Sequence, residues 1–382
     1  VNVPLSYRVC TRCVMDTSDP SITFDVNGVC SHCREFDEVT SKRWFPNKEG
    51  ERRLEAIAEK IRTEGRGQEY DCIMGLSGGV DSSYLALAVK DLGLRPLVVH
   101  VDAGWNSELA VHNIEQIIKY CDYELFTHVL NWEEVRDLQV AYLKAGIANQ
   151  DVPQDHAFFA ALYQFSVRNN IRFVLSGGNI ATESVFPSKW HHAAMDAINL
   201  KAIHKRYGRL PLRHYSSISL FDYYFYYPFI KKMTTVRPLN YMPYDLETAL
   251  GELKEKVGYK EYGRKHGESR FTKFFQNHYL PVKFGYDKRR PHLASKVLSG
   301  LITREQAEVE LTEALYDNAE LIQDKEYVAK KLGLSVQELD DLTAAPPHYY
   351  DEYPNWDRRF RFLKKVQSLV ERAIGRGLSN YS

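Results

Sequence analysis

The chain has 382 residues, with 50 Lys and Arg against 50 Asp and Glu, so its formal net charge is zero. This length can bury a sizeable core and predicts two or three modules. The neutral balance gives no general basic surface, so we expect no nucleic-acid partner. There is no signal-peptide pattern, and even the aromatic run at 220–230 is too short to span a bilayer, so we expect a cytoplasmic protein without membrane spans.

Two pairs of cysteines stand close to the start of the chain, with sixteen residues between them: Cys10 and Cys13, then Cys30 and Cys33. This spacing is typical of a zinc ribbon, in which two tight turns each present two thiolates to one tetrahedral ion. A reducing compartment disfavours the alternative of two disulfides, and a redox pair needs no duplication. We therefore predict a zinc-ribbon-like module over residues 1–45 that holds a structural zinc ion.

A glycine-rich loop follows the first predicted strand of the next module. Residues 70–76 are apolar enough for a buried strand, and helical spacing of apolar residues resumes over 82–92. Between them stand Ser77, Gly78, Gly79, Val80, Asp81, Ser82 and Ser83, without the Gly-Lys-Ser/Thr ending of a Walker loop. Backbone N–H groups in such a turn, with a helix N-terminus behind them, predict a site for a phosphate-sized anion. A turn without a ligand is the alternative.

Strands and helices continue to alternate after this loop. We predict strands over 96–101, 125–130 and 171–175, and helices over 51–63, 108–121, 133–144 and 157–168. This alternation indicates an α/β fold with a doubly wound parallel sheet over residues 46–250. In such a fold ligands bind outside the carboxyl ends of the strands.

Polar residues at and after these strand ends are candidates for the ligand site. Beyond the loop they are His100, Asp102, Trp105, Asn106, Gly178, Asn179, Thr182 and Glu183. Carboxylates from separate strand ends, Asp81 and Glu183, can hold a magnesium ion against phosphate oxygens. A position in the first turn of a helix explains Glu183 equally well, and Asp102 could be an N-cap.

A stretch rich in amides, at 149–156, separates two of the predicted helices. Pro153 as a helix stop and Asp155 as an N-cap explain part of its composition. The remaining amides, Asn149, Gln150 and Gln154, fit the recognition of a substrate.

The α/β alternation fades beyond residue 186. Residues 189–192 and 201–206 combine aromatic residues, histidines and cations, a composition suited to a sugar and its diphosphate. The cation-rich stretch 283–292 is either a solvated loop or a lid over phosphates. Helices are predicted over 293–332, 335–342 and 360–374, so residues 251–382 should form a mainly helical region that covers the site or forms an interface.

The loop sequence Ser-Gly-Gly-Val-Asp-Ser resembles the pyrophosphate loop (PP-loop) of the ATP pyrophosphatases, which have the adenine nucleotide alpha hydrolase-like fold. Longer runs narrow this resemblance. The runs at 99–108, 149–156, 175–184, 200–205 and 283–292 are similar to the N-acetyl sugar amidotransferases of bacterial surface-polysaccharide synthesis, the WbpG type. The resemblance covers nearly the whole chain, the four cysteines included.

The resemblance implies a reaction in lipopolysaccharide O-antigen synthesis. ATP and Mg²⁺ activate the acetamido group of a UDP-linked sugar, and ammonia then replaces the amide oxygen to give an acetamidino group, AMP and pyrophosphate. The ammonia comes from glutamine through a separate glutaminase subunit and a barrel-type partner. Cys72 and Cys121 are expected in the core rather than as nucleophiles.

The candidate residues then take the following roles. The loop residues 77–83, with His100, Asp102, Gly178 and Thr182, bind the nucleotide, and Asp81 and Glu183 hold magnesium. Asp81, Ser77 and Lys288 are the catalytic candidates. Candidates for the sugar nucleotide are Trp105, Asn106, Asn149, Gln150, Gln154, Asn179, Trp190, Lys201, His204, Arg289 and Arg290.

Two other functions stay open at this point. A tRNA-thiolating enzyme also combines this loop with N-terminal cysteines, but predicts a reactive cysteine near the strand ends and a basic surface. A nucleotide-binding subunit that only docks a partner predicts ATP binding without pyrophosphate release.

Overall fold

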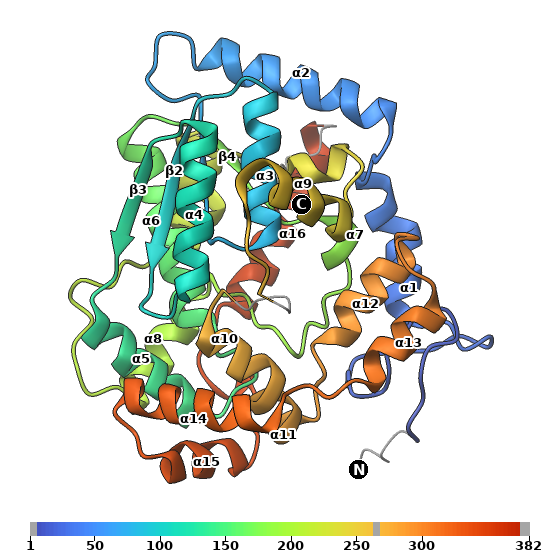
Figure 1. Ribbon diagram of the computed structural model, residues 1–382, viewed down its shortest axis with the longest axis vertical. Helices are drawn as coiled ribbons and strands as arrows, with labels where there is room; N and C mark the ends of the chain where they lie inside the picture. Colours follow the sequence, from blue (N-terminus) through green and yellow to red (C-terminus); the bar gives the residue numbers. More distant parts are fainter. Residues whose placement is uncertain (1–5, 263–267, 375–382) are drawn as a thin grey trace.

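The computed structural model describes residues 6–262 and 268–374 (Figure 1). At its centre is a five-stranded parallel sheet in the order β3-β2-β1-β4-β5. The strands are β1 (Cys72–Gly75), β2 (Pro96–Asp102), β3 (Leu125–Val129), β4 (Phe173–Leu175) and β5 (Thr234–Val236). The predicted parallel α/β sheet is confirmed, with β5 as a strand that the sequence analysis did not predict.

Alternate residues of β1 face two different parts of the core. Cys72 and Met74 pack with helices α2, α3, α4 and α9, whereas Ile73 packs with α6 on the opposite face. Both faces are therefore covered, which explains why the strand reads as a continuous apolar run. The helices that cover the sheet are α2 (Lys48–Glu64), α3 (Val80–Asp91), α4 (Glu108–Cys121), α6 (Val152–Arg168) and α9 (Leu246–Val257).

Helix α6 begins five residues earlier than predicted. Its N-cap residue is Asp151, and Pro153 stands in its first turn, where a missing N–H group costs nothing. The predictions of Pro153 as a helix stop and Asp155 as an N-cap are therefore wrong, because a proline that begins a helix looks in sequence like one that ends it.

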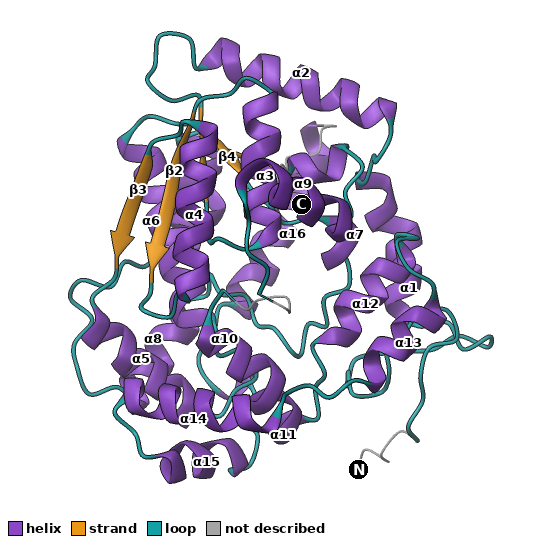
Figure 2. Ribbon diagram, viewed as in Figure 1, coloured by secondary structure: helices purple, strands orange, loops and turns teal. Residues whose placement is uncertain are grey.

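Most other helices lie beyond the carboxyl ends of the strands, as Figure 2 shows by the separation of strands and helices. The stretch 293–332, which was predicted as helical, is covered by three separate helices, α12, α13 and α14. The elements are α5 (Trp132–Ala145), α7 (Ile180–Glu183), α8 (Ala197–Tyr207), η3 (Asp222–Ile230), η4 (Pro238–Tyr241), α10 (Arg270–Phe274), η5 (Phe275–Tyr279), α11 (Leu280–Phe284), α12 (Arg289–Leu298), α13 (Arg304–Thr312), α14 (Asn318–Leu332), α15 (Val336–Ala344), η6 (Tyr350–Glu352) and α16 (Asp357–Ile374). Within the described ranges, none of the helices combines the length and apolarity that a bilayer crossing requires.

The N-terminal segment, with α1 (Ser31–Glu35), η1 (Phe36–Thr40) and η2 (Ser41–Arg43), packs against α12 and α13 (Figure 1). The four clustered cysteines share one apolar core with Leu293, Leu298 and Ala307 of these two helices. The boundaries proposed at 45/46 and 250/251 remain predictions, and residues 1–5 and 375–382 of the outer modules lie outside the described part of the chain.

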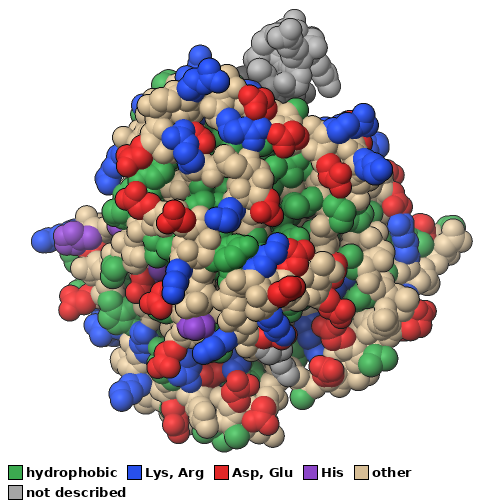
Figure 3. All heavy atoms as spheres, turned by 45° about the horizontal axis from the view of Figure 1, so that its top comes forward, with side chains coloured by type: hydrophobic (Ala, Val, Ile, Leu, Met, Phe, Trp, Pro, Cys, Tyr) green, Lys and Arg blue, Asp and Glu red, His purple; other side chains and the backbone are tan. Residues whose placement is uncertain are grey.

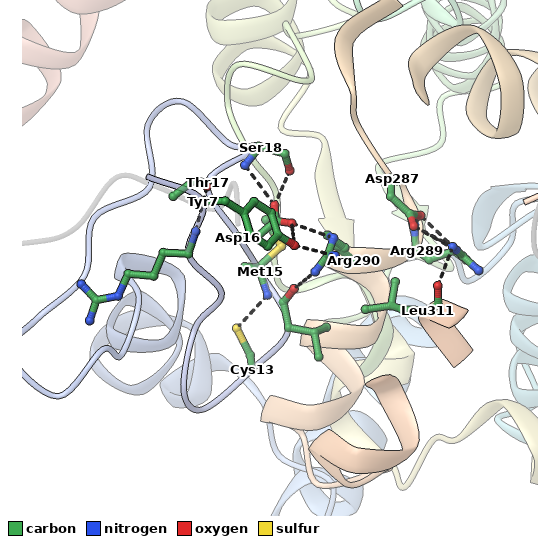
Figure 4. Close-up of polar contacts among 12 residues, drawn as sticks. Tyr7, Cys13, Met15, Asp16, Thr17, Ser18, Asp287, Arg289, Arg290 and Leu311 are labelled. Atoms are coloured by element: carbon green, nitrogen blue, oxygen red, sulfur yellow. Dashed lines mark hydrogen bonds and ion pairs between the residues drawn. The ribbon is translucent and has the colours of Figure 1, made fainter. Parts of the chain in front are cut away.

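Arg290 joins the cysteine segment to α12 (Figure 4). Its guanidinium donates to Val14 O at 2.7 Å and pairs with Asp16 Oδ2 at 3.0 Å. Asp16 is 2% exposed and also accepts from the Tyr7 hydroxyl at 3.0 Å. Arg290 thus binds the N-terminal segment and does not line the described cavity, so the structure gives no support to its predicted role in binding the sugar nucleotide.

Replacement of Arg290 by Gln should lower the free energy of unfolding by about 3 kcal/mol, because it leaves the Asp16 carboxylate buried without its cation. Denaturant unfolding measures this loss. The matched control is Arg12→Gln, which removes the exposed Arg12–Asp37 pair and should cost roughly 1 kcal/mol or less. Equal losses in the two variants would contradict the anchoring role of Arg290.

Candidate active site

A cavity of about 960 Å³ opens at the carboxyl ends of β1 and β4. Its wall contains the loop residues Ser77, Gly79, Val80, Asp81 and Ser82. Gly78 and Ser83 are buried and do not line it. The remaining wall comes from helices far along the chain, above all α6, α12 and α13. The sequence prediction that ligands bind at this edge of the sheet agrees with the position of the cavity.

The loop is held in place from behind by two tyrosines. Gly78 has φ of +85°, and its carbonyl oxygen accepts from the Tyr259 and Tyr262 hydroxyls, at 2.8 Å each. Burial raises the pKa of Tyr262 to about 12, which keeps this hydroxyl a donor at neutral pH. Because two hydroxyl groups already donate to the Gly78 carbonyl oxygen, its partial negative charge is compensated and does not repel an anion bound at the loop.

Helix α3 starts directly after the loop with Gly79 as its N-cap residue. Glycine has no side chain that could occupy the first N–H groups, so these groups remain for a ligand. Ser77 Oγ accepts from Gly79 N at 3.2 Å and lies 3.1 Å from Ser82 Oγ, which fixes both hydroxyls at the mouth of the loop. This arrangement suits a diphosphate.

Asp81 is oriented by two donors. The Tyr244 hydroxyl donates to Asp81 Oδ1, and Asn179 Nδ2 donates to the same oxygen at 3.2 Å. Burial, followed by the carboxylates of Asp81 and Glu183, raises the pKa of Tyr244 above its usual range, so this hydroxyl stays protonated. Asp81 and Glu183 both line the cavity, as two carboxylates that could hold a cation against phosphate oxygens.

The cysteine cluster lies apart from the cavity. All four thiols are fully buried, and their Sγ atoms lie within 4.8 Å of one another. His32 instead pairs with Asp19 at 2.7 Å, as expected of a residue that is not a fifth ligand. Four convergent sulfur atoms of this kind could bind a metal ion.

Comparison with models of known protein families gives a match to part of this chain. Residues 268–367 match the family model described as LPS biosynthesis protein WbpG-like, C-terminal domain. This matched segment contributes Lys288, Arg289 and His292 to the same cavity wall as the Ser77–Ser83 loop. The last quarter of the chain is thus similar to the C-terminal domain of the WbpG-like proteins. No match was found among curated proteins.

Among solved structures, the chain resembles the NH3-dependent NAD synthetase from Campylobacter jejuni, with 13% identity over 75% of this chain and 97% of the other, at a TM-score of 0.33. It also resembles the U34-tRNA thiolase NcsA from Methanococcus maripaludis, solved with its [4Fe-4S] cluster. That match has 12% identity over 85% of this chain and 89% of the other, at a TM-score of 0.34.

The polar residues at the end of β2 are not part of the described cavity wall. His100 Nδ1 contacts Leu76 O at 2.8 Å, and Asn106 Nδ2 donates to His100 Nε2 at 2.9 Å and to Asp102 Oδ1 at 3.2 Å. These contacts join the ends of β1 and β2. Aromatic residues that the sequence analysis did not select line the cavity instead: Phe158, Phe159, Tyr163 and Tyr223.

Three candidates for the sugar nucleotide are buried in the protein core and do not line the described cavity. Trp105 is 1% exposed and packs on Phe271, and Trp190 is fully buried against Tyr286, with ring centroids 4.5 Å apart. Gln150 is fully buried and donates to the carbonyls of Tyr142 and Ile147. Of their side-chain polar groups, the Gln150 amide nitrogen thus satisfies backbone carbonyls of the core.

Other candidates lie on α8 and in the loop before α6. His204 pairs with Asp137 at 3.3 Å, Lys201 is exposed on α8, and Asn149 donates to His192 O at 3.3 Å. None of these three residues lines the described cavity. Gln154 is half-buried and donates to Asp151 Oδ1 at 2.5 Å.

The remaining candidates surround the cavity. Gly178, Thr182, Lys288 and Arg289 line it, and Asn179 reaches Asp81. The Lys288 ammonium contacts His191 Nε2, while Arg289 is held by Asp287 and by the Leu311 carbonyl (Figure 4). The cavity wall also holds cations that sequence analysis missed, Arg237, His292 and Lys296. Arg237 directly follows β5. Because the sequence analysis did not predict this strand, it did not consider Arg237 among the residues at strand ends.

Replacement of Gly78 by Ala should abolish ATP binding, because the new Cβ would meet the Ala110 carbonyl oxygen at 2.8 Å in a left-handed backbone conformation. Gly93 is the matched control, since it has φ of +64° and no atom within 4 Å of an added Cβ. Gly93→Ala should cost about 1 kcal/mol of stability and leave ATP binding unchanged. Titration calorimetry with ATP compares them; normal binding by the Gly78 variant would contradict the clamped loop.

Proposed function

We propose that this protein is an ATP-dependent amidotransferase that converts the acetamido group of a UDP-linked sugar into an acetamidino group. The observation that carries the proposal is the shared cavity, in which the PP-loop faces cations of the segment that matches the WbpG-like family. The reaction would belong to the synthesis of lipopolysaccharide O-antigen or a related surface glycan.

The first half of the reaction activates a poor leaving group. The amide oxygen attacks the α phosphorus of ATP, and the loop around Ser77 and Ser82 holds the departing pyrophosphate. Asp81 and Glu183 would hold Mg²⁺, which neutralises charge on the phosphate oxygens. Lys288 and Arg237 line the cavity where the sugar diphosphate and the α phosphate need cations.

The second half needs ammonia. Cys72 and Cys121 are buried, and burial raises the pKa of Cys121 to about 11 and that of Cys72 further, so neither thiol is a ready nucleophile for glutamine hydrolysis. The other four cysteines face one another in the cluster. Ammonia supplied by a separate glutaminase subunit with a barrel-type partner fits this arrangement.

For the cysteine cluster we propose a single structural zinc ion. The Sγ atoms lie 3.7 Å apart for Cys10 and Cys33 and for Cys13 and Cys30, and 3.5 Å apart for Cys30 and Cys33. A tetrahedral ion with Zn–S bonds of about 2.3 Å places its ligands about 3.8 Å apart. An iron–sulfur cluster needs room for several iron atoms between the same thiolates, so the spacing favours one ion.

The tRNA-thiolation alternative gains no support. It requires a reactive cysteine at the strand ends, whereas all six cysteines are buried. The face drawn in Figure 3 also carries Lys and Arg interspersed with Asp and Glu, which differs from a basic surface for nucleic acid.

Pyrophosphate release from ATP with Mg²⁺ and ammonium should depend on one UDP-linked acetamido sugar in a panel. The product, identified by mass spectrometry, should be lighter by the difference between an oxygen atom and an NH group. Asp81→Asn should reduce the release at least 100-fold, whereas Asp91→Asn, exposed at the other end of α3, should not change it. Sugar-independent release, or none with glutaminase partner present, would contradict the proposal.

The purified protein should contain zinc in equal amount to the chain and no iron, as elemental analysis measures. Cys10→Ser should lose the zinc and unfold at lower denaturant concentration, because the structural site contributes to folding. Cys121→Ser provides a buried cysteine control outside the cluster and should keep its zinc. Iron with equimolar sulfide would contradict a single zinc ion.

A further inference from the structure

A row of exposed apolar side chains runs along η3, outside the described cavity wall. Phe221, Phe225 and Phe229 follow one another at every fourth position, and Ile230 ends the row. The ring centroids lie 5.7 Å apart for Phe221 and Phe225 and 5.4 Å apart for Phe225 and Phe229, so the rings form one continuous strip. The four side chains are 46% to 61% exposed. Large apolar groups that gather on a surface in this way mark a place where a partner binds.

Helix α16 extends this strip with Phe362 and Leu369, which are 66% and 64% exposed. A groove of about 450 Å³ separates the two elements; Phe221, Tyr224 and Phe225 line it from one side, and Arg358, Arg359 and Phe362 from the other. The Tyr224 ring also packs on Trp356 and Phe360, with ring centroids 5.6 and 5.2 Å apart. This packing holds both sets of apolar side chains on one surface. We call the described exposed side chains of residues 221–232 and 358–369 the η3–α16 face.

Cations border the apolar side chains of the η3–α16 face. Residues 220–232 and 357–369 together contain seven Lys and Arg but only two acidic residues, Asp222 and Asp357. Asp222 Oδ2 accepts from Ser219 Oγ at 2.7 Å, and Asp357 Oδ2 accepts from the Tyr350 hydroxyl at 3.2 Å. Within the described part of the chain, no carboxylate forms an ion pair with Arg358 or Arg359. The face is therefore positive in a chain whose net charge is zero.

The mixture of cations and aromatic rings favours one kind of partner. An apolar strip alone fits a protein as well as a lipid surface, but lysine is depleted in interfaces between proteins, and here Lys231, Lys232 and Lys365 stand among the phenylalanines. A helix of low overall hydrophobicity that carries Lys and Arg together with exposed Phe and Leu, as α16 does, is typical of helices that lie in the plane of a membrane interface. Anionic lipids then attract the cations, while the boundary between headgroups and acyl chains receives the apolar side chains.

We propose that the η3–α16 face docks the protein on an anionic lipid bilayer. Phe221, Phe225 and Phe362 enter the boundary between headgroups and acyl chains, and Arg358 and Arg359 contact the headgroup phosphates. Because Tyr223 of the same η3 lines the cavity, this element has the cavity on one side and the bilayer contact on another. The contact does not depend on which reaction the cavity performs.

The full chain should co-sediment with vesicles of phosphatidylglycerol and phosphatidylcholine but not with vesicles of phosphatidylcholine alone. Binding should weaken as salt is added, because salt screens the cations from the headgroups. Arg358→Gln combined with Arg359→Gln should weaken binding about tenfold or more. The matched control is Lys42→Gln combined with Arg43→Gln, which removes two exposed charges from η2 and should leave vesicle binding unchanged.

Phe221→Ser combined with Phe362→Ser tests the apolar contribution. Vesicle binding should again fall about tenfold or more, because two large side chains no longer leave water on docking. Both residues are more than half exposed, so the variant should unfold at the same denaturant concentration as the wild type. Val26→Ser, at a position that is 98% exposed in the cysteine segment, is the control and should bind vesicles normally.

A wild type that does not bind anionic vesicles would overturn the proposal, and so would wild-type binding by both double variants of the face. Analytical ultracentrifugation tests the alternative occupant, a second copy of the chain. A dimer that Phe221→Ser with Phe362→Ser separates, with vesicle binding unchanged, would assign the face to that copy and overturn the bilayer contact. Turnover of a soluble sugar nucleotide tests the proposed function separately, since neither double variant changes a residue of the described cavity wall.

Discussion

Three consecutive cations at the start of α12 connect the parts of this molecule. Lys288 contacts His191 at the cavity, Arg289 binds Asp287 and carbonyls of α13, and Arg290 binds Val14 and Asp16 of the cysteine segment. Positive charge at a helix N-terminus opposes the helix dipole and destabilises the helix when it has no partner. Here each cation has a specific partner, and the partners lie in three different directions.

This arrangement gives the cysteine cluster an indirect role in the site. Arg304 of α13 donates to the Cys13 and Cys10 carbonyls at 3.2 Å, and α12 and α13 carry much of the cavity wall on their other side. A metal ion that fixes the cysteine turns would fix those carbonyls as well. The cluster can therefore take no part in the chemistry and still determine where Lys288 and Arg289 stand.

The elements that could be predicted from the sequence are those whose capping residue or apolar pattern matches the cap or the burial seen in the structure. Helix 108–121 has its predicted bounds because Ser107 caps it, and the apolar runs of β1, β2 and β4 reflect strands covered on both faces. Strand β5 is only Thr-Thr-Val, which carries too little pattern to separate it from a loop. It is a strand because it pairs with β4, a contact between distant parts of the chain.

The candidate site was predictable where backbone geometry determines it and less so where side chains from distant segments meet. The paired glycines identified the loop at 77–83, but nothing local shows that Tyr244, Tyr259 and Tyr262 orient it. The amides at 149–154 looked like recognition groups, yet Gln150 satisfies backbone carbonyls in the core. A glutamine has the same appearance in sequence for either use, and only the contact of Gln150 with Tyr279 of η5 and with the core carbonyls shows which one applies.

The charges of the described cavity wall set a limit on what binds there. Arg237, Lys288, Arg289, His292 and Lys296 stand against the carboxylates of Asp81, Glu183, Glu261, Glu268, Glu310 and Glu313. A free phosphate would meet repulsion from these carboxylates as well as attraction from the cations. The nucleoside triphosphate of the proposed function would arrive with a divalent cation, and the carboxylates would then hold the metal while the basic side chains would contact phosphate oxygens. The mixed wall thus favours a metal–nucleotide complex over a bare anion.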